Sequence, residues 1–299
     1  MSELRINNIT DRAGSSGPII AGVSTVTSTS HMVMPSGPTE FRGGRGRGVS
    51  AGGVTPSNTK LMEFFEIATT GNAAEFGDLS RQKRGMGGCS SSTRGIIMGG
   101  YHPSPAAYFK EIEYVTISSS GGANQFGDLT FLSGWGGSCS NNTRGLYGGD
   151  WGTYSNVINF VTIATIGDAS NFGDLTAGRQ VTGSTSSTTR GVWFGGSIYG
   201  PDAPAYTMYN VIDFITIASE GNATDFGDTR YAVSGIHFTT ATGSNSIRGV
   251  IGGGTTPTTR TEIQFITIAS TGSASDFGDL SVSKYNGAGA SDSHGGLAQ

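Results

Sequence analysis

Short apolar segments separated by glycine-rich stretches dominate the hydrophobic pattern of the chain. The segments are rich in β-branched and aromatic residues and bounded by Gly, Ser or Asn, as at 157–163 and 211–217. Within 211–217, alternation places Ile212 and Phe214 on one face and Ile215 on the other. Both faces are therefore apolar, which is typical of a sheet covered on both sides. Helical periodicity is absent, so the pattern predicts an all-β protein.

The apolar segments belong to a repeat of about 50 residues. Each copy carries an Arg-Gly pair, a Gly-Gly pair, an apolar segment and the tetrad Phe-Gly-Asp-Leu, which ends in Thr229 in the fourth copy. The arginines are Arg47, Arg94, Arg144, Arg190 and Arg248, and the tetrads begin at Phe76, Phe126, Phe172, Phe226 and Phe277. This period, with several short strands and paired glycines, is typical of β-propeller blades. We therefore expect a five-bladed β-propeller.

The segment after the last tetrad predicts how the ring of blades closes. Residues 282–289 correspond to 81–88, which lead into the Arg-Gly strand of the next blade. The first Arg-Gly strand has no such predecessor. We therefore expect the C-terminal segment to supply the missing strand of the first blade. The propeller would then span 47–299 and leave no open sheet edge.

Composition argues against several classes of protein. The chain has 50 Gly in 299 residues and only 13% charged residues, but 9% aromatic residues argue against disorder. A net charge of −4 offers no basic face for nucleic acid. We find no signal peptide and no apolar run near the roughly 18 residues of a membrane span. Cys89 and Cys139 are expected to be small buried thiols, with a disulfide as the alternative.

The sequence contains no recognisable catalytic or metal-binding pattern. The histidines lack metal-ligand spacing, and they are His31, His102, His237 and His294. We therefore expect no cofactor, no metal and no enzymatic activity, with a glycan-active enzyme as a third-ranked alternative. The tetrad acids are expected to bind backbone N–H groups in turns, and they are Asp78, Asp128, Asp174, Asp228 and Asp279. The repeated arginines would bridge strands or pair with these acids.

The loop after each Gly-Gly pair varies in length and character while its flanks stay constant. Aromatic residues on loops held by a rigid scaffold are typical of recognition surfaces, and flat rings suit the apolar faces of sugars. The candidate ligand-binding residues are Tyr101, His102, Tyr108, Trp151, Tyr154, Tyr199, Tyr206 and Tyr209. Another variable loop carries Trp135, His237 and Phe238 in its different copies. The alternative is that these rings pack against a neighbouring protein or plug the propeller's own rim.

The repeat resembles kelch repeats, in which an apolar strand ending in Gly-Gly precedes a variable loop, a second strand and an aromatic position. Phe76 and its equivalents stand where kelch repeats usually have tryptophan, so the resemblance is to a divergent kelch-like family. The wording of the repeat is similar to repeats in structural and tail fibre proteins of tailed bacteriophages, cyanobacterial phages in particular. The similar elements are, in order, Thr-Arg-Gly, Gly-Gly, Ile-Thr-Ile-Ala-Ser and Phe-Gly-Asp-Leu. The resemblance covers about 250 residues.

Residues 1–46 lie outside the repeats. Leu4-Arg5-Ile6-Asn7-Asn8-Ile9-Thr10, followed by Gly14 to Pro18, resembles the N-terminal segment of phage tail fibre proteins. The resemblance implies an extended attachment arm that docks to other tail or baseplate proteins, with a flexible terminus as the alternative. We interpret 41–48, at its end, as a Gly/Arg linker and not as an RNA-binding segment.

Together these resemblances imply a virion protein of the phage tail, made in the host cytoplasm. The propeller loops would contact a glycan-type receptor on the host surface, without nucleic-acid binding or membrane insertion. The alternative is a purely structural virion component whose propeller contacts other proteins of the particle. We expect a homo-oligomer; trimers are common among phage fibres, although no coiled-coil heptad supports one in this chain.

Overall fold

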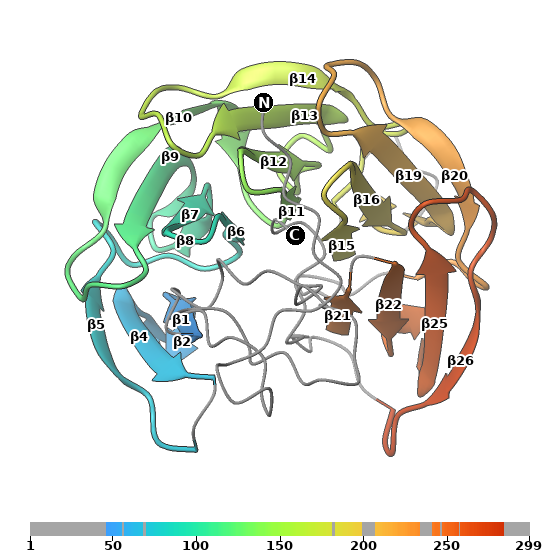
Figure 1. Cartoon of the computed structure of the whole chain (residues 1–299), viewed down its shortest axis with the longest axis horizontal. Coiled ribbons are helices and arrows are strands. Elements are labelled where there is room, and N and C mark those ends of the chain that lie inside the picture. The colour runs from blue at the N-terminus through green and yellow to red at the C-terminus, as the bar shows by residue number, and fades with distance from the viewer. Residues whose placement is uncertain are drawn as a thin grey trace, which may run out of the picture. The chain divides into compact units, whose positions relative to one another are not determined.

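The computed structural model describes residues 46–55, 57–67, 70–180, 183–198, 207–233, 241–245, 247–256 and 258–283. Throughout these segments all strand pairs are antiparallel and there is no helix. The strands form five blades around a common centre, so the chain is a five-bladed β-propeller (Figure 1). The expected fold class is confirmed. The expected arm at 1–46, apart from Gly46, and the closing strand beyond Ser283 lie outside the described residues.

The third blade shows the plan of a complete blade. Its strands are β11 (Gly137–Ser140), β12 (Arg144–Gly148), β13 (Val157–Thr162) and β14 (Ser170–Asp174). They follow one another from the inner to the outer edge of a four-stranded sheet (Figure 1). Because the second, third and fourth sheets each lie between two others, their side chains are buried on both faces, and the apolar clusters of the core combine residues of neighbouring blades.

The other blades repeat this order. The second contains β6 (Gly87–Ser90), β7 (Arg94–Met98), β9 (Ala106–Thr116) and β10 (Asn124–Ser133). The fourth contains β15 (Gly183–Ser186), β16 (Arg190–Phe194), β19 (Val211–Thr216) and β20 (Thr224–Asp228). The fifth contains β21 (Ala241–Ser244), β22 (Arg248–Gly252), β25 (Glu262–Thr267) and β26 (Ser275–Asp279). The first contains β1 (Arg47–Ala51), β4 (Leu61–Glu66) and β5 (Ala74–Asp78), so its inner strand is missing from the described residues.

Short hairpin strands connect the second and third strands of four blades. They are β2 (Val54–Thr55) with β3 (Ser57–Asn58), β8 (Tyr101–Pro103) with β9, β17 (Ser197–Ile198) with β18 (Thr207–Met208), and β23 (Thr255–Thr256) with β24 (Thr258–Thr259). Three of these hairpins begin directly after the Gly-Gly pair, and the β23–β24 hairpin begins one residue later. They therefore carry the loops that vary between repeats.

The Phe-Gly-Asp-Leu tetrad forms a β-bulge in the outermost strand. In the third blade Gly173 pairs with Ile158 and Asn171 with Asn159, so Phe172 is the extra residue. The buried ring of Phe172 packs edge-to-face on Phe160, with ring centroids 5.7 Å apart. All five copies show the same register shift. In the first four blades the repeated Phe-Gly therefore encodes a bulge that places an aromatic ring in the core.

The arginines of the first four Arg-Gly pairs each join their blade to the next one. The guanidinium of Arg144 lies 4.8 Å from the ring centroid of Phe160 in its own blade. Its Nη1 donates a hydrogen bond of 2.9 Å to the carbonyl of Ile217 in the fourth blade. The same bond joins Arg47 to Ile117, Arg94 to Ile163 and Arg190 to Ile268. We call this contact the arginine joint.

The tetrad acids differ from the sequence expectation. The carboxylates of Asp78 and Asp128 form exposed ion pairs with Lys60 and Lys110, at 2.9 and 3.0 Å. For these acids the expected role in binding backbone N–H groups is wrong. Of the two roles expected for the repeated arginines, bridging is confirmed for the four arginines of the arginine joints, which bind main-chain carbonyls of the next blade and do not pair with the tetrad acids.

The glycine of the Arg-Gly pair accommodates a side chain of the preceding blade. A Cβ at Gly145 would lie 2.8 Å from the Sγ of Cys89, and one at Gly191 equally close to the Sγ of Cys139. Both cysteines are free thiols, as expected. Burial raises the pKa of Cys89 to about 12 and raises the pKa of Cys139 as well. Both thiols are therefore protonated, packed parts of the core at neutral pH.

We expect Gly173→Ala to lower the free energy of unfolding by about 2–4 kcal/mol. Gly173 has a φ of 150°, and a Cβ there would overlap the carbonyl of Gly221 in the next blade. The control is Gly167→Ala, where a Cβ meets open space, and it should change the stability by at most about 1 kcal/mol. Urea unfolding measures both variants. Equal effects would show that the glycine of the bulge does not control the approach of neighbouring blades.

Candidate functional site

Five aromatic side chains from the second and third blades form one contiguous group, which we call the aromatic cluster. Its members are Tyr101, Tyr108, Trp135, Trp151 and Tyr154. Neighbouring ring centroids lie between 5.0 and 6.2 Å apart, within the range of favourable aromatic contacts. All five side chains are half-buried, so each ring keeps some surface exposed to solvent.

One hairpin and two loops bring these rings together. Tyr101 and Tyr108 are direct partners across the β8–β9 hairpin. Trp135 lies between β10 and β11, whereas Trp151 and Tyr154 lie between β12 and β13. The ring of Trp135 is 5.1 Å from Tyr101 and 5.9 Å from Trp151. Trp135 therefore connects the hairpin of the second blade with the loop of the third.

The backbone of the cluster is held in unusual conformations. Trp135 and Tyr154 have φ values of 60° and 51°, and they are the non-glycine residues with positive φ among those described. Such conformations cost about 1–3 kcal/mol each and persist where the surroundings enforce them. The buried carboxylate of Asp150 accepts hydrogen bonds from the N–H of Gly134 at 3.2 Å and of Thr153 at 2.6 Å. Asp150 thereby ties the two loops of the cluster together.

The cluster has little charge of its own at neutral pH. Burial, helped by the negative charge of Asp150, raises the pKa of Tyr108 to about 12, so its phenol stays neutral. The guanidinium of Arg84 lies 5.6 Å from the ring centroid of Tyr101 and places one cation beside the rings. The site therefore combines apolar ring faces with phenol O–H and indole N–H groups, a surface suited to a ligand with both apolar faces and hydroxyl groups.

The structure brings together four of the eight predicted site residues, which are Tyr101, Tyr108, Trp151 and Tyr154. His102 follows Tyr101 in β8, and its Nδ1 accepts the N–H of Ser104 at 3.2 Å. Strand alternation places it on the opposite side of the hairpin from Tyr101. Tyr209 belongs to the fourth blade, 5.8 Å from the guanidinium of Arg179.

Two further predicted residues, Tyr199 and Tyr206, lie outside the described residues, as do His237 and Phe238. Trp135 was grouped with another variable loop. Its place in the cluster depends on how the second and third blades pack, which no local sequence pattern reveals. The indication available in the sequence was that large aromatic residues also occur in the connection between consecutive blades, as Trp135 does between β10 and β11.

Two buried ion pairs are the strongest charged features away from the cluster. The Nζ of Lys83 lies 2.6 Å from the Oε2 of Glu113, and the Nη2 of Arg179 lies 2.8 Å from the Oδ2 of Asp213. Burial opposes ionisation of Glu113, but the adjacent Lys83 outweighs it and lowers the pKa of Glu113. These side chains are at most 3% exposed, so they are not open to a substrate.

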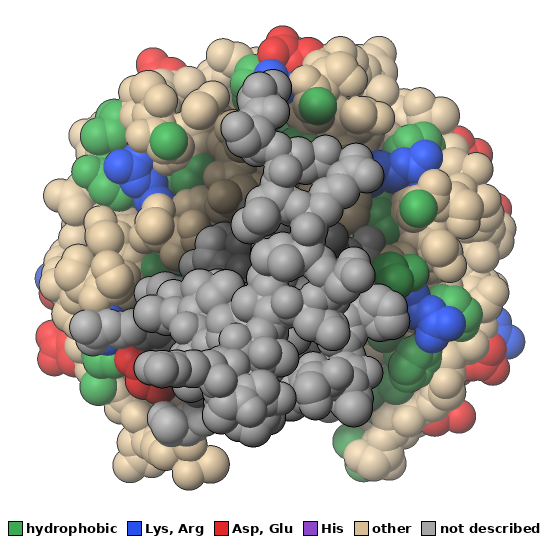
Figure 2. Space-filling view, in the orientation of Figure 1, with side chains coloured by type: hydrophobic (Ala, Val, Ile, Leu, Met, Phe, Trp, Pro, Cys, Tyr) green, Lys and Arg blue, Asp and Glu red, His purple; other side chains and the backbone are tan. Residues whose placement is uncertain are grey.

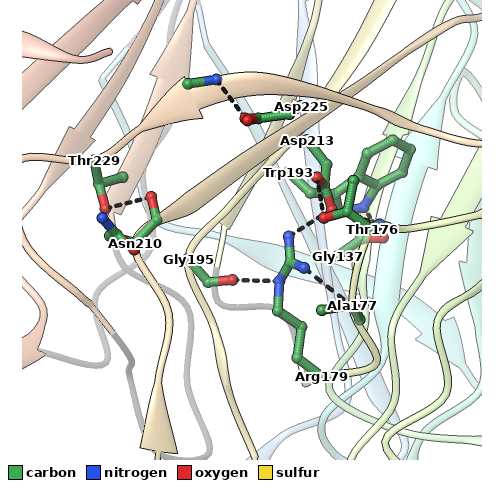
Figure 3. Close-up of polar contacts among 11 residues, drawn as sticks. Gly137, Thr176, Ala177, Arg179, Trp193, Gly195, Asn210, Asp213, Asp225 and Thr229 are labelled. Atoms are coloured by element: carbon green, nitrogen blue, oxygen red, sulfur yellow. Dashed lines mark hydrogen bonds and ion pairs between the residues drawn. The ribbon is translucent and has the colours of Figure 1, made fainter.

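Figure 3 shows the Arg179 network in detail. Arg179 also donates to the carbonyls of Gly195 and Ala177, at 2.6 and 3.2 Å. Asp213 accepts the hydroxyl of Thr176 at 2.6 Å. The buried charges of Arg179 and Asp213 are thus satisfied by each other and by these hydrogen bonds, and we interpret both buried ion pairs as structural.

Other kinds of site find no support in the described parts of the chain. There, no group of three His, Cys, Asp or Glu could hold a metal ion. No helix in these segments is long and apolar enough to cross a membrane. On the visible part of the face in Figure 2, Lys and Arg side chains occur in separate patches and form no continuous basic surface.

Neither a protein-family model nor a curated protein matches this sequence. The functional argument therefore depends on the aromatic cluster and on the repeat pattern.

We expect Tyr108→Phe to weaken the loss of stability at high pH. Between about pH 10 and about pH 12 the unfolded phenol ionises while the folded one keeps its proton, so stability falls as pH rises through this window. Phenylalanine has no hydroxyl to ionise, so the variant lacks this pH-dependent loss of stability, whereas the wild type shows it. Urea unfolding across this pH range measures the difference. Identical pH slopes for the two proteins would contradict the raised pKa of Tyr108.

Proposed function

We propose that the protein is a binding module that recognises a carbohydrate through the aromatic cluster. The observation that carries this proposal is the convergence of five half-buried rings from two blades on one connected surface. Tyr and Trp provide a large contact area with few rotatable bonds, so ordering them on binding costs little entropy.

A sugar ring is a good chemical match for this surface. Its C–H groups form apolar faces that stack on flat aromatic rings, and its hydroxyl groups surround those faces. The phenol groups of Tyr101 and Tyr108 can exchange hydrogen bonds with these hydroxyls. The Asp150 carboxylate and the Trp135 and Tyr154 backbones hold the rings before the ligand arrives, which lowers the cost of binding.

The biological setting in the proposal comes from the sequence resemblance. The kelch-like phage repeats favour a tail or fibre protein of a bacteriophage particle, with residues 1–46 attached to the tail or baseplate. The glycan would then belong to the host surface, and the protein would bind it without chemical change. A homo-oligomer would present several copies of the cluster and raise the avidity for a repetitive glycan.

A contact with another protein of the particle is the second candidate function. The packing of the rings on one another favours this second function. Packed Tyr and Trp residues beside an Arg are typical of the centres of protein interfaces. The two candidates differ in what covers the rings in the assembled particle.

We expect Trp151→Ala to weaken carbohydrate binding about tenfold or more, because it removes a ring from the stacking surface. The measurement is binding of the purified chain to a glycan array that includes host-surface polysaccharides, followed by titration of any hit. Phe109→Ala is the matched control and should bind like the wild type. Phe109 follows Tyr108 in β9 and lies 4.8 Å from Arg81, on the other side of the strand.

Two outcomes would contradict carbohydrate recognition by the cluster. One is the absence of saturable binding of the folded wild type to any glycan. The other is equal loss of binding in the Trp151 and Phe109 variants. Circular dichroism of each variant verifies that it is folded.

A further inference from the structure

The main chain of Arg84 and Gly85 is held against two rings of the aromatic cluster. The N–H of Arg84 donates to the carbonyl of Tyr101 at 3.0 Å, and the N–H of Tyr101 donates to the carbonyl of Arg84 at 2.8 Å. Gly85 accepts the N–H of Trp135 at 2.7 Å, and a Cβ at Gly85 would lie equally close to the indole ring. This main chain brings the guanidinium of Arg84 to 5.6 Å from the ring centroid of Tyr101.

The framework of the propeller needs no cation at the position of Arg84. The equivalent residues, each three places before an inner strand, are Gly134 before β11 and Gln180 before β15. The main chain of Gln180 pairs with Ser197 as that of Arg84 pairs with Tyr101. The buried amide of Gln180 donates to the hydroxyl of Ser197 at 2.6 Å, and Gly134 has no side chain. Packing of the blades therefore does not explain the charge of Arg84.

The charge of Arg84 is not neutralised as the neighbouring charges are. Arg81 lies 2.7 Å from Glu111, and Lys83 forms its buried pair with Glu113. Arg84 forms no ion pair with a described residue, and its Nε is buried without a hydrogen-bond partner among them. A buried donor without a partner costs free energy, which contact with an anion would recover.

The other charge of the cluster is enclosed by protein. Asp150 is 0% exposed, and its carboxylate accepts the hydroxyl of Thr153 at 2.9 Å in addition to the two N–H groups described above. The pKa of Tyr108, raised to about 12 by burial, keeps that phenol neutral. Arg84 is half-buried, so its side chain keeps surface exposed to solvent. The charge that a ligand of the cluster meets directly is therefore positive.

A guanidinium beside aromatic rings is suited to a sugar that carries an anionic group. Its planar set of N–H donors binds a carboxylate or a sulfate through two parallel hydrogen bonds, which are stronger than bonds between neutral groups. Acidic sugars carry such a group on a ring that also has apolar C–H faces and hydroxyls. The ring of an acidic sugar can thus face the aromatic side chains while its anionic group contacts Arg84.

We propose that the ligand of the aromatic cluster is an acidic saccharide and that Arg84 binds its anionic group. This inference rests on the proposed function, because it names the class of carbohydrate that the same site recognises. The rings provide the contact area, and Arg84 selects acidic over neutral sugars. Because Arg84 is partly exposed, this selectivity weakens as the salt concentration rises.

Matched polysaccharides test the selectivity of the full-length wild type. Polygalacturonate and its carboxyl-reduced form differ in the carboxylate, whereas dextran sulfate and dextran differ in the sulfate. We expect at least one acidic member to bind about tenfold or more tightly than its neutral counterpart. The pair that shows the difference identifies the anion as a carboxylate or a sulfate. Equal binding within both pairs would overturn the inference.

Arg84→Gln should remove this selectivity and leave binding of the neutral member within about twofold of the wild type. Glutamine occupies the equivalent position in the fourth blade, so the framework accepts it there. Arg81→Gln is the matched control, because Arg81 lies beside Phe109 on the other side of β9 from Tyr108. It removes the same charge and should keep the selectivity. Unchanged selectivity in Arg84→Gln, or equal loss in both variants, would overturn the contact with Arg84.

The melting temperature distinguishes a binding role of Arg84 from a structural one. Arg84→Gln should change it by at most about 3 °C, because the substitution removes no ion pair or side-chain hydrogen bond to the described residues. A fall of roughly 10 °C would show that Arg84 supports the fold and would overturn the inference.

The same measurements separate this inference from the proposed function. If the wild type binds neutral glycans of the array but no acidic one, the inference fails and carbohydrate recognition by the cluster remains. If it binds no glycan of either kind, both fail.

Discussion

The arginine joint is the contact on which this propeller depends. One guanidinium lies over an aromatic ring of its own blade and donates a hydrogen bond to a carbonyl of the next blade, at four successive boundaries. A hydrogen bond to a charged donor contributes about 1.5–3 kcal/mol, and the arginine–ring contact adds about 0.5–2 kcal/mol. The bulged phenylalanine below that ring and the glycine beside the arginine allow the sheets to approach closely.

The candidate site follows from this spacing of the blades. The hairpin of the second blade and the loop of the third form one aromatic cluster because their sheets pack closely, and the joint between Arg94 and Ile163 is one of the contacts that hold these sheets together. Trp135 and the buried Asp150 then connect the two loops. A rigid ring of sheets thus carries a recognition surface whose residues come from segments far apart in the sequence, while the framework below it repeats.

Sequence reasoning predicted the fold and the blade boundaries, which recur along the chain, but it missed several contacts that depend on particular side chains. The repeated Arg-Gly and Phe-Gly marked the blade boundaries because each copy meets the same packing requirement. The role of Asp78 and Asp128 was wrong because Lys60 and Lys110 are cross-strand neighbours that no motif joins to them. Four cluster rings were predicted from loop variation, but Trp135 was placed in a separate group. His102 was included because loop membership does not reveal the side of a hairpin.

Amide hydrogen exchange of β1 tests most directly whether the same joints run around the entire ring. The account predicts that the amides of β1 exchange about as slowly as those of β12, which has paired strands on both sides. Rapid exchange along β1, with β12 still protected, would contradict it and would show that the first blade keeps an open edge.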